Sequence, residues 1–102
     1  MDSKKFFDEI AQLLAKSHGG VASQMFGKKC IKINGKAGVA YYQDCLVFKL
    51  PENERNQALS LPDSKLWDPS GKGRPMKEWV QLSILHKGKF KKLAKIAADY
   101  VG

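Results

Sequence analysis

The chain has 102 residues, 43% of them hydrophobic and 10% aromatic, and a formal net charge of +8 at pH 7. This length and composition fit one folded domain spanning residues 1–102 and exclude an intrinsically disordered chain. No stretch of about 18 apolar residues predicts a transmembrane helix, and the charged segment 1–5 lacks the apolar core of a signal peptide, so we expect a cytoplasmic protein without a membrane partner.

The positive charge is unevenly distributed along the chain. Residues 1–50 have eight basic and four acidic side chains, residues 51–83 have five of each, and residues 84–102 have five lysines and one aspartate. A positive field attracts polyanions such as nucleic acid, but it also keeps a protein soluble. The net charge therefore raises the expectation of nucleic-acid binding only modestly.

A helix is predicted over residues 3–17. Ser3 is a candidate N-cap, and the apolar side chains from Phe6 to Leu14 recur every three or four residues on one face. Gly19 and Gly20 follow, and glycine is the usual residue where a helix ends in a left-handed conformation.

Three strands are predicted next, at residues 28–33, 37–42 and 45–50, because apolar and polar side chains alternate there. Asn34-Gly35 is a strong signal for a type I′ hairpin between the first two strands. Gln43-Asp44 forms a second tight turn, so the three strands are expected to form an antiparallel meander.

Alternation assigns the two faces of this meander. The side chains expected to face the helices are Ile31, Ile33, Val39, Tyr41, Leu46, Phe48 and Leu50. The opposite face is half polar, and we expect it to be exposed, as one face of an antiparallel sheet commonly is. It is either a candidate interface for a second copy or a ligand, or an ordinary hydrated sheet face; the interface residues are Lys32, Tyr42, Val47 and Lys49.

The second half of the chain is predicted to contain a short helix at 51–59, strands at 65–68 and 75–82, and a last helix at 83–100. Gly88 weakens this last helix by about 1 kcal/mol relative to alanine, so its regular part is expected to begin near Lys89. Pro51 suits the first position of a helix, and Ser83 is a candidate N-cap. The order α-β-β-β-α-β-β-α lacks the regular alternation of a parallel sheet, so we expect an α+β fold.

The last helix has a row of lysines four residues apart. Lys87, Lys91 and Lys95 share one face, and Lys92 lies beside them. Like charges at this spacing repel by about 0.3 kcal/mol per pair, a cost that suits a polyanion partner, although a solvated helix face has the same pattern. Lys72 and Arg74, in a predicted turn at 69–73 and just after it, are further candidates for polyanion binding.

Few residues suggest catalysis. His18 and His86 lie at the ends of different helices, without the spacing of a metal site. Cys30 and Cys45 are expected to be free thiols in a reducing compartment. We therefore expect no enzyme activity, no catalytic residue, no metal ion and no other cofactor.

Two short motifs together resemble a known family. Met25-Phe26-Gly27 precedes the strand that ends at Asn34-Gly35, and a GRPM-x-x-W-V segment follows some 45 residues later. This order resembles the N-terminal domain of the TfoX/Sxy competence-regulator family over nearly the whole chain. The matching residues are Met25, Phe26, Gly27, Gly73, Arg74, Pro75, Met76 and Trp79.

The resemblance implies a bacterial protein with a two-layer α-β(3)-α-β(2)-α fold and an antiparallel sheet. Family members regulate natural-competence genes and have a second, C-terminal domain, so this chain is expected to be the stand-alone form. The family has no catalytic residues, and most motif residues are expected to be structural, with Arg74 the polar exception. Lys28 stands where the family usually has a second glycine, so the chain departs from the motif at this position.

Two hypotheses about function follow. The first is a non-catalytic, transcription-associated module that binds DNA or a DNA-bound regulatory protein. The second is a protein–protein interaction or homodimerisation module with no role in nucleic-acid binding.

Overall fold

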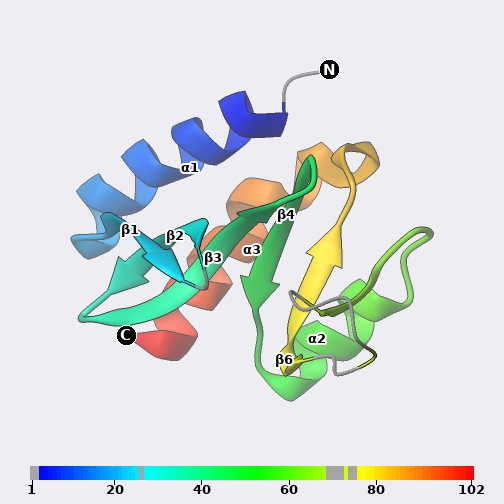
Figure 1. Ribbon diagram of the computed structural model, residues 1–102. Helices are drawn as coiled ribbons and strands as arrows, with labels where there is room; N and C mark the ends of the chain where they lie inside the picture. Colours follow the sequence, from blue (N-terminus) through cyan, green and yellow to red (C-terminus); the bar gives the residue numbers. More distant parts are fainter. Residues whose placement is uncertain (1–2, 26, 69–72, 74–75) are drawn as a thin grey trace.

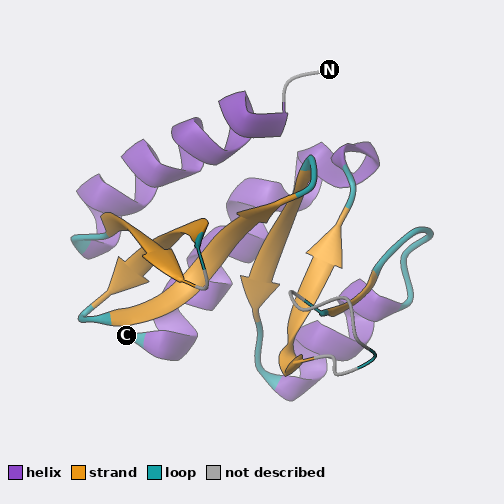
Figure 2. Cartoon of the chain, in the orientation of Figure 1, coloured by secondary structure: helices purple, strands orange, loops and turns teal. Residues whose placement is uncertain are grey.

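The computed structural model describes residues 3–25, 27–68, 73 and 76–102. Within these residues, three α-helices and a six-stranded antiparallel sheet make up the fold, which confirms the predicted α+β class (Figures 1 and 2). The elements are α1 Ser3–His18, β1 Val21–Met25, β2 Lys28–Ile33, β3 Lys36–Tyr42, β4 Cys45–Lys49, α2 Glu52–Leu59, β5 Lys65–Trp67, β6 Met76–Leu82, the 3-10 turn η1 Ile84–His86 and α3 Lys87–Val101.

The strands are arranged in the order β1-β2-β3-β4-β6-β5, and each pairs antiparallel with its neighbours. Strands β1 to β4 follow one another as hairpins. Asn34 and Gly35 have φ angles of 52° and 80°, as the predicted type I′ turn requires. Gln43 and Asp44 also have positive φ angles, of 45° and 61°, between the paired ends of β3 and β4.

The sheet has one strand more than the sequence analysis expected. Residues 21–25 form β1, which pairs with β2 from Val21 opposite Lys32 to Met25 opposite Lys28. This strand was missed because Val-Ala-Ser-Gln-Met has little β-branched or aromatic character. The helix predicted from Ser83 also begins differently: Ser83 accepts a hydrogen bond from the Leu85 N–H at the start of η1, and α3 begins at Lys87.

One face of the sheet packs against all three helices. Phe7, Ile10 and Leu14 of α1, Ala58 of α2 and Phe90 of α3 belong to a single buried cluster with this face. The side chains of the meander predicted to face the helices all lie in or against this cluster, namely Ile31, Ile33, Val39, Tyr41, Leu46, Phe48 and Leu50, and Val80 and Leu82 of β6 join them. The two-layer prediction therefore places this core correctly.

The opposite face is not open, which corrects the expectation of an exposed surface there. Val47 has no exposed area and belongs to a second buried cluster with Cys30, Ala40, Trp67 and Trp79. The cause is β5, which extends the sheet beyond β6 and brings Trp67 to this face, 5.3 Å from the ring centroid of Trp79 and 5.8 Å from that of Tyr42.

Candidate polyanion-binding surface

The lysines of α3 lie on the side of the helix that faces away from the sheet. Phe90, Leu93, Ala94 and Ala97 are buried on the other side. The predicted residues Lys87, Lys91, Lys92 and Lys95 are all exposed, as is Lys89. We refer to these five residues as the lysine face. Lys89 was missed because it falls outside the row of lysines four residues apart. The density of five lysines within nine residues could have indicated that Lys89 belongs to the same basic surface.

The lysine face has few partners within the protein. Among the described residues, the ion pairs are His18 with Asp99 and Lys49 with Glu78, and neither involves the lysine face. The Lys87 ammonium lies 5.9 Å from the centroid of the Phe6 ring, a weak cation–π contact. The positive charges are therefore available to an external anion.

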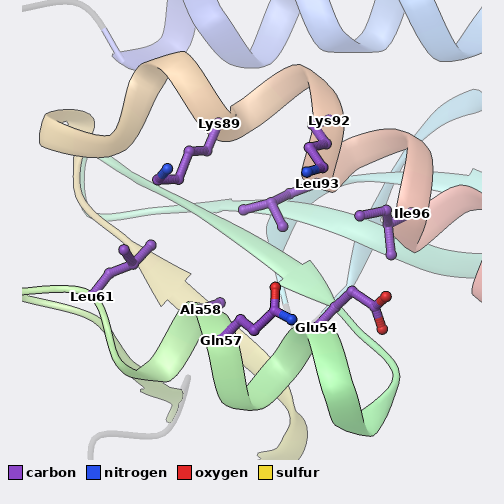
Figure 3. A pocket seen from close by; sticks show the side chains of 8 residues that line it. All are labelled: Glu54, Gln57, Ala58, Leu61, Lys89, Lys92, Leu93 and Ile96. Carbon is purple, nitrogen blue, oxygen red and sulfur yellow. The ribbon is translucent and has the colours of Figure 1, made fainter.

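Two grooves flank α3, and lysines line both. The groove between α2 and α3 has a volume of about 330 Å³. Lys89 and Lys92 lie on its α3 side, and Glu54 and Gln57 lie opposite on α2 (Figure 3). Its apolar lining comes from Ala58, Leu61, Leu93 and Ile96.

The groove between α1 and α3 has the same volume, about 330 Å³, and is lined by Lys87 and Lys91 together with Phe6, Glu9 and Phe90. Lysines thus extend from one groove across α3 to the other. The arrangement is a continuous convex basic surface with an open, partly apolar groove on each side.

A third cavity, of about 270 Å³, lies where the end of α3 meets the sheet. The Tyr100 hydroxyl donates a hydrogen bond of 2.9 Å to Glu78, whose other carboxylate oxygen lies 3.5 Å from the Lys49 ammonium. The hydrogen bond from Tyr100 holds the pKa of Glu78 below its ordinary value, with a smaller contribution from Lys49. The same bond raises the pKa of Tyr100.

The four predicted interface residues do not form one exposed patch. Val47 is buried, while Lys32, Tyr42 and Lys49 are half-buried. Tyr42 packs against the buried cluster of the second face, and the Lys28 ammonium lies 5.4 Å from its ring centroid. Lys49 instead contacts Glu78 at the third cavity.

Among the described residues, no histidine or cysteine lines any of these three cavities. His18 contacts Ser17 and Asp99 at an exposed helix end, and His86 Nε2 lies 2.6 Å from the carbonyl oxygen of Pro62. Burial raises the pKa of the Cys30 thiol, which favours its unreactive protonated form. The described residues include no group of three or more side chains suited to hold a metal ion, and no described helix is long and apolar enough to cross a membrane.

The family-motif residues that the structure describes have packing or turn positions. Gly27 and Gly73 have φ angles of 73° and 77°, which glycine adopts without strain. Trp79 is 4% exposed in the second cluster, and Met76 packs against that cluster. Met25 belongs to β1. The motif residues Phe26, Arg74 and Pro75, and the candidate Lys72, lie outside the described residues.

Comparison of the chain with models of known protein families, with curated proteins and with solved structures gave no significant match.

Proposed function

We propose that the chain is a non-catalytic binding module whose lysine face binds the phosphate backbone of duplex DNA, in the manner of a transcription-associated protein. The observation that supports it is the set of five exposed lysines on one helix, none of them in the ion pairs of the described residues. The resemblance to the TfoX/Sxy regulators agrees with this role.

The dimensions of the lysine face suit a polyanion better than a single small anion. Lys87 and Lys95 are eight residues apart, which corresponds to about 12 Å along a helix. Duplex DNA has one phosphate charge per about 1.7 Å of its axis, so several phosphates lie within reach of the row. Contacts of this kind position a protein on DNA without selecting a sequence.

The alternative, an interaction module that uses the sheet face around Tyr42 and Val47, has less support. Val47 is fully buried and Tyr42 packs on the same cluster. Of the predicted interface residues, the three that are not buried are half-buried, whereas the five lysines of the lysine face are all exposed.

A fluorescence-anisotropy titration of labelled duplex DNA tests the proposal. We expect binding at micromolar protein in about 50 mM salt. The binding constant should fall as the salt concentration rises, and each phosphate neutralised should add about 0.9 to the steepness of log K plotted against log salt. The double variant Lys91→Gln/Lys95→Gln should reduce this slope by about 2. Absence of binding in low salt would refute the proposal.

The matched control is Lys65→Gln/Lys77→Gln, which removes the same charge from exposed positions of β5 and β6 instead of α3. If both double variants weaken binding equally, the effect reflects net charge alone, and the assignment to the lysine face is wrong.

A further inference from the structure

The two edges of the sheet differ in a way that bears on self-association. The edge strands are β1 and β5. β5 has only three residues, whereas β1 has five, Val-Ala-Ser-Gln-Met, with no charged residue and no proline. Val21 in β1 is 62% exposed, and Ala22 and Gln24 are exposed as well.

Proteins normally protect long edge strands from pairing by lysines, prolines, bulges or a covering segment. The β1–β2 register runs without a bulge, and in the sheet of the described residues β1 has β2 as its neighbour on one side alone. An uncharged edge is unusual on a chain with a net charge of +8.

The register indicates which backbone groups are available. Two residues separate Met25 from Lys28, which face each other in β1 and β2. A two-residue connection is closed by a hydrogen-bonded pair, and such pairs alternate with non-bonded ones along an antiparallel ladder. The N–H and C=O groups of Ala22 and Gln24 are therefore directed away from β2, toward the open edge.

We propose that β1 pairs antiparallel with β1 of a second copy of this chain, forming one continuous twelve-stranded sheet around a two-fold axis at Ser23. In this register Ala22 of each copy faces Gln24 of the other. Because both have outward backbone groups, each facing pair exchanges two hydrogen bonds, and Ser23 faces its own symmetry mate at a non-bonded position.

The charges favour a second copy at this edge. No facing pair contains a charge, so the repulsion between like charges opposite each other is avoided. The nearest lysines in the same row, Lys28 of one copy and Lys32 of the other, are three strand spacings apart, about 14 Å. That separation exceeds the Debye length of about 8 Å at physiological salt.

The two-fold symmetry of the proposed dimer determines on which side of the continuous sheet the helices of each copy lie. A two-fold axis perpendicular to the sheet leaves each face on its own side, so the helix layers of both copies lie on the same side of the continuous sheet. The dimer does not depend on DNA binding, and its test can fail or succeed independently of that proposal.

Sedimentation velocity over a range of protein concentrations tests the dimer. We expect a concentration-dependent dimer for the natural chain and at least a tenfold weaker association for Ser23→Lys, which places two ammonium groups opposite each other at the axis. The matched control Gln12→Lys adds the same charge at an exposed position of α1 and should weaken association much less. A natural chain that stays monomeric at about millimolar concentration, or equal dimerisation of both variants, would overturn the proposal.

Amide hydrogen exchange provides a second readout on the unaltered chain, so the test does not rest on a variant that could misfold. The Ala22 and Gln24 amides should exchange more slowly as protein concentration rises, whereas the Ser23 amide, paired within each copy, should be protected at every concentration. A dimer without this concentration dependence at Ala22 and Gln24 uses a different surface and refutes β1 pairing.

Discussion

His18 at the end of α1 and Asp99 near the end of α3 are linked by a contact of 2.7 Å between Nε2 and Oδ1, although 81 residues separate them. At the other end of the same two helices, Phe6 packs edge-on against Phe90 with ring centroids 6.1 Å apart. These two contacts align α1 with α3 in the same direction.

Removing the negative charge from this contact should loosen the alignment slightly. Asp99→Asn is expected to lower the free energy of unfolding by less than about 1 kcal/mol, because Asp99 is exposed and water screens the interaction. Urea denaturation measures the change. The control Asp63→Asn removes the same charge from an exposed turn with a positive φ angle that asparagine tolerates; an equal loss for both variants would contradict a specific role for the His18 contact.

The bond from Tyr100 to Glu78 should make stability depend on pH. Since the pKa of Glu78 is lowered in the folded state, its contribution is present above the ordinary glutamate pKa of about 4.3 and is lost as pH falls through the lowered value. The pKa of Tyr100 is raised, so that contribution is present below the ordinary tyrosine pKa of about 10 and is lost as pH rises through the raised value.

Tyr100→Phe should therefore be destabilising near neutral pH, and its difference from the natural chain should shrink as pH falls below the ordinary glutamate pKa of about 4.3 and through the lowered value. Unfolding free energies measured between neutral and acidic pH test this. Tyr42→Phe removes the same atom from another ring and should show no such convergence; a constant difference for Tyr100→Phe would exclude the link to Glu78.

Trp79 and Val47 should behave as core residues. Trp79→Ala is expected to cost about 3–5 kcal/mol of unfolding free energy, a large part of the total stability of a domain of this size. Val47→Lys should fail to fold cooperatively because it buries an unpaired charge. If Val47→Lys remains as stable as the natural chain in thermal unfolding, the second cluster is open to solvent after all.

The lysine face should be more useful for binding than for stability. Lys91→Glu replaces two like-charge contacts, with Lys87 and Lys95, by two attractive ones, and should raise the unfolding free energy by about 1 kcal/mol. The same variant should weaken DNA binding more than Lys91→Gln, because it adds repulsion as well as removing a contact. Parallel urea and anisotropy titrations compare the two effects; a variant that is both less stable and bound equally well would refute the assignment.

The local features of the fold could be predicted from the sequence. The alternation from Lys28 to Leu50 predicted every side chain of the meander that faces the helices. Successive side chains of a strand point to opposite faces, so the face with the apolar residues must be the one that packs against the core. Asn34-Gly35 fixed a turn whose positive φ angles few other residue pairs accept. The exposed positions of Lys87, Lys91, Lys92 and Lys95 followed from helical spacing alone.

The features that depend on tertiary arrangement could not. Val47 is buried in one cluster with Trp67 of β5 and Trp79 of β6, and the strand order places β6 between β4 and β5. The alternation of residues within β4 does not indicate which strands lie beside it or which side chains cover Val47. β1 was missed for a different reason: its five residues have weak strand propensity, and pairing with β2 outweighs that preference.

Because α1 and α3 run parallel, the two helices give the molecule a net dipole moment along their shared direction. The peptide dipoles of each helix sum to about half a positive charge at its N-terminus and half a negative charge at its C-terminus, and parallel helices add these moments, whereas antiparallel helices cancel them. Lys87 and Lys89 lie at the positive end of α3, and Asp99 lies toward the negative end. The side-chain and backbone charges therefore reinforce each other, so a polyanion at a distance exerts a torque that turns the first turn of α3 toward it before any contact forms.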